Sequence, residues 1–353
     1  MKKTALVICP GRGTYNKPEL GSISANLGAS SPKIKEDLQS VLSQIDAERA
    51  QSGLATVSEL DQAKLFKTSL HQKPEHAAAL IYAAGYLDYL SIDRERYDIA
   101  AITGNSMGWY TAMACGGAWS VATSTRLVTS MALLTAGGAG AQFIYPVVDS
   151  EWRPDAQRIA LVEEQLAAHQ GQLMRSINYG GYAVLAGTEE ACAAAMKALP
   201  VADERFPLLL PGHAAFHTRL MAAAAAQAQE TWPVAAFQPP QTPLIDGRGQ
   251  QWLSPETDRT ALQRYTLGHQ VTETFDFTKA VQVAVKEYAP DHIILLGPGS
   301  GLGGAVAQSL IAINWQGLRS KADFSERQTQ ADVPYVLSMG LAEQRALVTA
   351  GRN

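Results

Sequence analysis

The pentapeptide Gly104-Asn105-Ser106-Met107-Gly108 constrains the fold of this chain more than any other stretch. It follows the apolar, β-rich run 97–103 and precedes 109–115, which is typical of the start of a helix. A Gly-x-Ser-x-Gly turn between a strand and a helix is a nucleophile elbow, which exposes the serine hydroxyl above the helix N-terminus. The motif could be a chance match in an Ala/Gly-rich chain, but the strand and helix patterns on its two sides favour an elbow. They predict an α/β fold with a nucleophile at Ser106.

Composition narrows the class of protein. The chain has 353 residues, of which 46% are hydrophobic and 18% charged, and this suits one large α/β domain with or without a smaller insert. A net charge of −4 gives no sign of a nucleic-acid surface, and no apolar run is long enough to span a bilayer. We therefore expect neither nucleic-acid nor membrane partners.

The cysteines and the first residues bear on location. Cys9, Cys115 and Cys192 are far apart and lack the spacing of a metal site or a disulfide framework. The apolar run 4–9 is too short for a signal peptide and lacks a cleavage site, so it is interpreted as the first buried strand. These features predict a cytoplasmic protein without a metal ion.

Further periodic segments complete a large α/β domain. Besides strands at 4–9 and 97–103, the pattern predicts strands at 243–246 and 292–296. Helices are expected at 33–48, 58–70, 76–87, 120–136 and 302–312, and an Ala-rich helix to about 230. A parallel sheet is the expected arrangement. The polar tail from about residue 317 receives no predicted role.

A smaller unit interrupts this rhythm. Strands are expected at 142–148, 172–178, 181–187 and 205–210, with helices at 154–170 and 188–199. The order β-α-β-β-α-β is that of a ferredoxin-like domain. We therefore predict a large domain over 1–138 and 212–353 with a small domain inserted at 139–211.

Five segments resemble, in order, the malonyl-CoA:acyl-carrier-protein transacylases and the related polyketide synthase acyltransferase domains. They are Pro10-Gly11-Arg12-Gly13, the elbow, Asn178-Tyr179-Gly180-Gly181, Ala215-Phe216-His217-Thr218 with Leu220-Met221, and Leu296-Gly297-Pro298-Gly299. Together they span roughly residues 4–312. The resemblance implies an α/β-hydrolase-like large domain with a parallel sheet and an inserted ferredoxin-like small domain.

The resemblance also assigns roles. A serine hydroxyl needs an adjacent base, and His217 matches the family's motif, with His213 as the local alternative. In the family a glutamine carbonyl orients the base, which points to Gln270. The backbone N–H groups of Met107 and Arg12 would hold the oxyanion.

One departure from the family bears on the substrate. Malonyl-specific members carry an arginine 25 residues after the serine, where this chain has Met131. A buried methionine cannot neutralise a carboxylate, so we expect an uncharged acyl group. The alternative is that Arg12, which replaces the family's glutamine, supplies the cation for malonyl. The expected pocket residues are Met131, Trp109, Asn105, Asn178 and Phe216.

The predicted activity is ping-pong transfer of an acyl group between coenzyme A and an acyl carrier protein through an acyl-serine, in fatty acid or polyketide biosynthesis. The alternatives are a hydrolase that strips acyl groups from carrier proteins, malonyl transfer that uses Arg12, and an inactive docking subunit. No cofactor is expected, since acyl-coenzyme A would be a substrate. The carrier protein is expected to be acidic, and Arg319, Lys321 and Arg327 are weak candidates for contacting it. The alternative is that they belong to a solvated tail.

Overall fold

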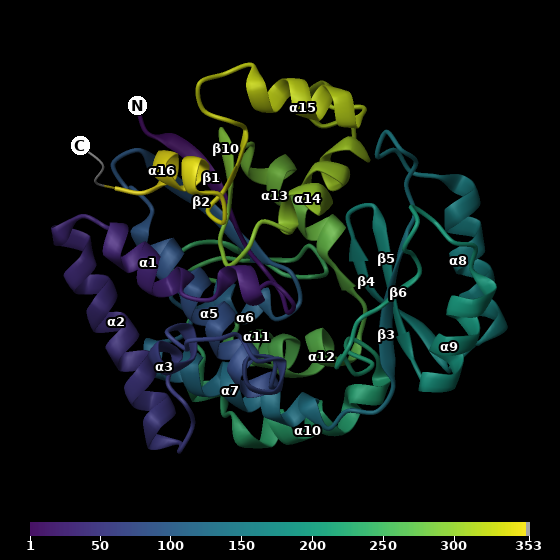
Figure 1. Cartoon of the computed structure of the whole chain (residues 1–353), viewed down its shortest axis with the longest axis horizontal. Helices are drawn as coiled ribbons and strands as arrows, with labels where there is room; N and C mark the ends of the chain where they lie inside the picture. Colours follow the sequence, from purple (N-terminus) through teal and green to yellow (C-terminus); the bar gives the residue numbers. More distant parts are fainter. Residues whose placement is uncertain (351–353) are drawn as a thin grey trace.

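The computed structural model describes residues 1–350. Figure 1 shows a large α/β domain and, beside it, a smaller domain made by the teal middle of the chain. The mixed α/β class with a large and a small domain is as predicted, whereas the exact domain boundaries stay a prediction.

The large domain is built on a six-stranded sheet with the order β11-β10-β1-β2-β7-β8. Its neighbours pair in parallel except β7 and β8. Ala5 to Cys9 are completely buried, as expected of a parallel strand that is covered on both faces. The strands are β1 (Lys3–Cys9), β2 (Tyr97–Gly104), β7 (Leu244–Ile245), β8 (Gln251–Trp252), β10 (His292–Leu295) and β11 (Val336–Ser338).

Helices cover both faces of this sheet (Figure 1). On one side α6 packs on β1 and β2 with α5 and α7 beside it, and on the other α13 packs on the same strands with α14 behind it. The helices of the large domain are α1 (Ser22–Ala29), α2 (Pro32–Gln51), α3 (Val57–Asp61), α4 (Thr68–His71), α5 (Pro74–Ser91), α6 (Gly108–Cys115), α7 (Val121–Ala136), α10 (Ala222–Thr231), α11 (Arg259–Arg264), α12 (Gln270–Thr272), α13 (Phe277–Tyr288), α14 (Leu302–Ile311), α15 (Lys321–Thr329) and α16 (Ala342–Val348).

Short tight or wide helical turns connect several of these elements. They are η1 (Lys17–Glu19), η2 (Arg219–Met221), η3 (Val234–Ala236), the π-helix η4 (Tyr265–His269) and η5 (Trp315–Gly317). The π-helix runs directly into α12, so its wide turn lies just before Gln270.

The small domain has the predicted β-α-β-β-α-β order. Its elements are β3 (Ala141–Pro146), α8 (Ala156–Ala168), β4 (Leu173–Tyr179), β5 (Tyr182–Gly187), α9 (Glu189–Ala198) and β6 (Leu208–Leu209). The sheet order is β6-β3-β5-β4-β9, where β9 (Phe275–Asp276) comes from outside the predicted range 139–211. Because β9 pairs in parallel with β4, the segment that follows α12 joins the two domains.

Two predicted elements differ from the structure. The helix expected at 58–70 is two short helices, α3 and α4, and Asp61, the last residue of α3, accepts hydrogen bonds from the amides of Ile23 and Ser24 and from the Tyr15 hydroxyl. The strand expected at 205–210 is reduced to the two residues of β6.

The C-terminal tail, to which the sequence assigned no role, completes the large sheet. Its strand β11 pairs with β10, and Arg345 on α16 lies 2.6 Å from the carboxylate of Asp88 on α5. Asp88 also accepts the backbone N–H of Gly297 at 2.8 Å. The tail therefore fixes the Gly297-Pro298-Gly299 turn through a buried ion pair.

Cys9, Cys115 and Cys192 are buried and free. Within residues 1–350, no helix combines the length and the apolar character needed to cross a membrane.

Candidate active site

The elbow places Ser106 at the carboxyl end of β2, directly before α6. Ser106 has a φ of 55°, in the left-handed region that non-glycine residues rarely adopt. A Cβ at Gly104 would clash with the carbonyl of Gly108, and one at Gly108 would clash with that of Cys9. Both glycines are thus required for the close backbone approach that holds the serine in this turn.

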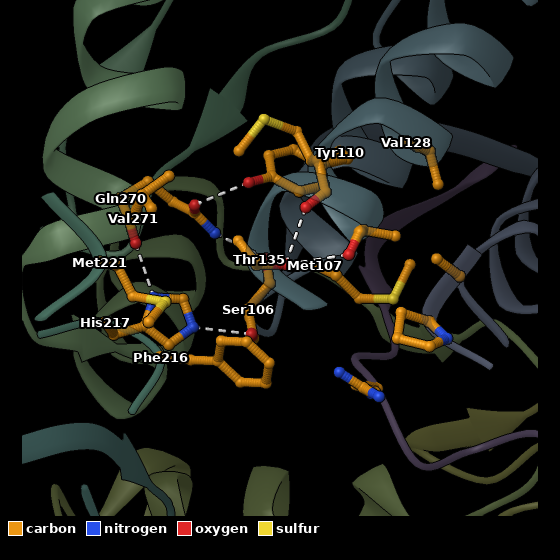
Figure 2. A pocket seen from close by; sticks show the side chains of 15 residues that line it. Ser106, Met107, Tyr110, Val128, Thr135, Phe216, His217, Met221, Gln270 and Val271 are labelled. Carbon is orange, nitrogen blue, oxygen red and sulfur yellow. Dashed lines mark hydrogen bonds between the residues drawn. The ribbon is translucent and has the colours of Figure 1, made fainter. Parts of the chain in front are cut away.

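His217 lies directly against the serine (Figure 2). Its Nε2 is 2.7 Å from Ser106 Oγ, and its Nδ1 is 2.6 Å from the backbone oxygen of Gln270. Because a carbonyl only accepts, Nδ1 carries the proton and Nε2 is free to accept the serine hydroxyl proton. This is the arrangement that a nucleophile and a general base require.

His213, the alternative base, points elsewhere. Its Nδ1 lies 2.7 Å from Oε1 of Gln142 in the small domain, and within residues 1–350 no hydrogen bond joins it to Ser106. The geometry therefore favours His217 as the partner of the serine.

Gln270 contributes its side chain as well as its carbonyl. Its Nε2 donates to the backbone oxygen of Ser106 at 3.1 Å, and its Oε1 accepts the Tyr110 hydroxyl at 3.0 Å. One residue thus contacts both His217 and the turn that carries Ser106. The sequence analysis missed this amide and Tyr110, since contacts across such long sequence separations leave no local pattern.

Burial controls the charge of the base. Loss of solvent lowers the pKa of His217 to about 4, although the hydrogen bond to the Gln270 carbonyl acts in the opposite direction. The imidazole is therefore neutral at pH 7 and can accept a proton.

The predicted oxyanion donors lie beside the serine. Met107 and Arg12 line the same pocket as Ser106. Within residues 1–350, neither backbone N–H donates to a protein acceptor. Two free amides next to Ser106 at a helix N-terminus are an arrangement that can stabilise a developing oxyanion.

One side of Ser106 opens into a pocket of about 600 Å³, its solvent-open mouth included. The Tyr110 hydroxyl is bonded to Gln270, and the Thr135 hydroxyl donates to the Met131 carbonyl at 2.7 Å, so neither needs a ligand. The pocket is therefore largely apolar. Its walls are formed by Arg12, Pro74, Ala78, Ser106, Met107, Tyr110, Val128, Met131, Ala132, Thr135, Phe216, His217, Met221, Gln270 and Val271.

On its other side Ser106 faces a larger cleft between the domains, of about 1830 Å³. Arg12, Ser106 and Phe216 line both spaces, so the serine lies where the pocket and the cleft meet. The small domain contributes an apolar wall to the cleft through Ile144, Ile177, Tyr179, Val184 and Leu210.

Arg12 is a cation without an anionic partner at this junction. Its guanidinium lies 5.5 Å from the centre of the Phe216 ring, and burial lowers its pKa. Within residues 1–350, no carboxylate lies within ion-pairing distance of it, and none lines the pocket or the cleft.

No family model matches the chain. Over 238 residues it is 27% identical to the malonyl CoA-acyl carrier protein transacylase of Salmonella typhimurium, an alignment that covers 65% of this chain and 72% of that protein. The transacylase of Coxiella burnetii has the same fold, with a TM-score of 0.74 at 14% identity over 98% of this chain and 97% of that one. The chain is related to the malonyl CoA-acyl carrier protein transacylases.

A further transacylase relative was solved as a complex. This malonyl-transacylase is bound to a type II polyketide synthase acyl-carrier protein, and it matches with a TM-score of 0.69 and 21% identity over 88% of this chain and 93% of that one.

Three of the predicted pocket residues do not line the pocket beside Ser106. Trp109 is fully buried and donates to Thr266 at 3.0 Å, because the first turn of α6 faces the π-helix η4. Asn178 on β4 donates to Asp276 at 2.9 Å, and Asn105 lines the interdomain cleft instead of the pocket. Met131 and Phe216 do lie in the pocket wall.

The basic tail residues also lie away from the site. The Lys321 ammonium lies over the Trp152 ring, and the Arg327 guanidinium lies over the Tyr335 ring. Neither they nor Arg319 line the pocket or the cleft. Within residues 1–350, no group of three or more His, Cys, Asp or Glu side chains could hold a metal ion.

Proposed function

We propose that this protein transfers an acyl group between coenzyme A and an acyl carrier protein through an ester on Ser106. The observation that carries the proposal is the chain of hydrogen bonds from Ser106 Oγ through the His217 imidazole to the Gln270 carbonyl, placed where the apolar pocket meets the interdomain cleft. The names of the related transacylases, and the relative bound to a carrier protein, support the two substrates.

In the first half of the reaction, Ser106 Oγ attacks the thioester carbonyl while His217 Nε2 takes its proton. The free N–H groups of Met107 and Arg12 stabilise the oxyanion of the tetrahedral intermediate. Collapse of the intermediate breaks the carbon–sulfur bond, and His217 returns the proton to the departing thiolate of coenzyme A. The acyl group remains as an ester on Ser106.

In the second half, the thiol of the carrier's phosphopantetheine arm enters through the interdomain cleft. His217 takes the thiol proton, the sulfur attacks the ester carbonyl, and Ser106 Oγ leaves with the proton from His217. The scheme needs no redox step and no metal ion, since His217 handles each proton transfer.

The acyl group is proposed to be uncharged. Met131 and its neighbours Val128 and Ala132 on α7 present an apolar wall, and burial of an unpaired carboxylate against it would be costly. The pocket thus favours acetyl or a longer uncharged chain.

A second candidate is transfer of a malonyl group. It is favoured by the unpaired Arg12 guanidinium beside Phe216, which lines the same pocket as Met131 and could hold a carboxylate. The names of the relatives favour malonyl as well.

The deciding experiment compares acetyl-, octanoyl- and malonyl-coenzyme A as donors to a holo acyl carrier protein, with wild type and Arg12→Gln. The proposal predicts faster transfer of the uncharged groups in both proteins. Malonyl as the preferred donor in wild type, lost in Arg12→Gln, would establish the second candidate instead. Release of free acid in place of acyl-carrier would identify a hydrolase.

A further inference from the structure

Four lysines of the large domain lie on two segments that also contribute residues to the lining of the interdomain cleft. Lys64, Lys67 and Lys73 lie on the segment 62–73, and Lys17 lies on η1; all four are exposed. We call these four residues the lysine rim. Thr68, Ser69, Gln72 and Lys73 of the same segment line the cleft, so the rim borders the entrance that leads to Ser106.

The two parts of the rim are held together. The side chain of Gln72 donates to Asn16, the neighbour of Lys17, at 3.5 Å, and Asn16 also lines the cleft. The short helix α4 begins after Lys67, and Phe66 stacks on His71 at 4.8 Å between ring centres. The segment is therefore a defined surface of the large domain.

The charge of the rim is uncompensated. The chain as a whole has a net charge of −4, yet the sequence from Gln62 to Pro74 contains no Asp or Glu. Within residues 1–350, none of the four lysines forms an ion pair. Glu19 and Glu75 each lie two residues from a rim lysine, but within residues 1–350 neither forms an ion pair. Asp61, three residues before Lys64, is buried and accepts hydrogen bonds from Tyr15, Ile23 and Ser24.

The rim also presents an apolar contact. Leu65 is 69% exposed between Lys64 and Lys67. An exposed leucine flanked by unpaired cations fits a partner with acidic side chains around an apolar patch.

We propose that the lysine rim docks the acyl carrier protein and places its phosphopantetheine arm in the cleft. The inference rests on the proposed function, which requires a carrier at this entrance. Acyl carrier proteins are small, helical and negatively charged, so the rim is complementary to them in charge. The phosphates of coenzyme A share this anionic chemistry, but the exposed Leu65 favours a protein surface.

The test separates the two half-reactions in Lys64→Glu/Lys67→Glu. Acylation of Ser106 by acyl-coenzyme A is the first half, and transfer from acyl-enzyme to holo acyl carrier protein is the second. We expect the second to slow by about tenfold or more at low ionic strength, with the first changed far less. The difference should shrink at about 1 M salt, where the Debye length falls to about 3 Å.

The matched control is Lys33→Glu/Lys35→Glu. These exposed lysines are on α2, on the side of the large domain away from the small domain (Figure 1), and their reversal changes the net charge equally. The control should transfer to the carrier at the wild-type rate. An equal loss in the control, or unchanged transfer in the rim variant, would overturn the proposal, as would an equal loss of both half-reactions, which would assign the rim to coenzyme A.

A binding measurement tests the docking surface without requiring catalytic turnover. The affinity of a holo acyl carrier protein for Ser106→Ala, with and without the rim substitutions, is measured by calorimetry. Weaker binding in the rim variant supports the docking surface even if no acyl-enzyme ever forms. Binding that is equal in both proteins refutes it, whatever the outcome for the proposed function.

Discussion

At the scale of single residues, the charge state of His217 decides whether Ser106 can be activated. The imidazole is buried beside the nucleophile, and desolvation lowers its pKa to about 4. It therefore remains a neutral acceptor over the whole range from weakly acidic to basic pH. The backbone carbonyl of Gln270 fixes its tautomer without adding the charge that a carboxylate would bring.

This low pKa predicts the pH at which the reaction rate falls on the acid side of its pH profile, its acid limb. The rate of Ser106 acylation should stay level as the pH falls from 8 to 5 and drop only near pH 4, as measured by stopped-flow release of coenzyme A. His213→Asn should leave that limb in place, because His213 is bonded to Gln142. A midpoint near 6.5 would contradict the account of His217.

The same shift affects folding. The unfolded chain binds a proton on this histidine near pH 6.5, whereas the folded chain binds it only near pH 4. The stability that the folded chain gains from this pKa difference is thus fully present above pH 6.5, and it is lost as the pH falls to about 4. It amounts to at most about 3 kcal/mol in the free energy of unfolding.

Met131 carries the prediction about the substrate. Met131→Arg should raise kcat/KM for malonyl-coenzyme A by about tenfold or more, since a hydrogen bond to a charged group contributes about 1.5–3 kcal/mol. Uncharged donors should react more slowly with this variant. Met131→Leu, which keeps the wall apolar, serves as the control, and a malonyl rate that does not rise in Met131→Arg would count against the pocket assignment.

At the scale of elements, the core of the site could be predicted from local pattern. The buried run of β2, the elbow and α6 follow one another in sequence, so Ser106 could be located from that stretch alone. The wall formed by Val128, Met131, Ala132 and Thr135 also has helical spacing on α7, and this signal would have found it.

Other contacts had no such signal. Trp109 turns toward Thr266, 157 positions later, and the Gln270 amide reaches Ser106 across 164 positions. The direction of a side chain around a helix depends on what packs against it, which a single sequence does not show. The motif therefore predicted the position of Ser106 in the elbow, but not the directions in which Trp109 and the Gln270 amide point.

The tail element α16 carries a stability prediction. Arg345→Met would leave the Asp88 carboxylate buried without its cation, and we expect a loss of about 3–5 kcal/mol in urea unfolding. Arg96→Met removes an exposed arginine that pairs with the partly buried Asp93, and it should cost less than about 1 kcal/mol. Similar small changes in both variants would refute the structural role of the tail.

At the scale of the whole molecule, the two domains form different parts of the space around Ser106. The large domain supplies Ser106 and the apolar pocket, whereas the small domain supplies the opposite wall of the cleft. Strand β9, which directly follows the segment containing Gln270, completes the small domain's sheet. The segment 270–276 thus both accepts the hydrogen bond from His217 and joins the two domains.

The most direct test of the account is intact-mass spectrometry after brief exposure to acetyl- or octanoyl-coenzyme A. Wild type should gain the mass of one acyl group, and adding a holo acyl carrier protein should remove it. Ser106→Ala should gain nothing, and His217→Ala should gain it far more slowly. An acyl adduct of equal yield in Ser106→Ala, or none in wild type with any donor, would contradict the central claim that Ser106 carries the acyl group.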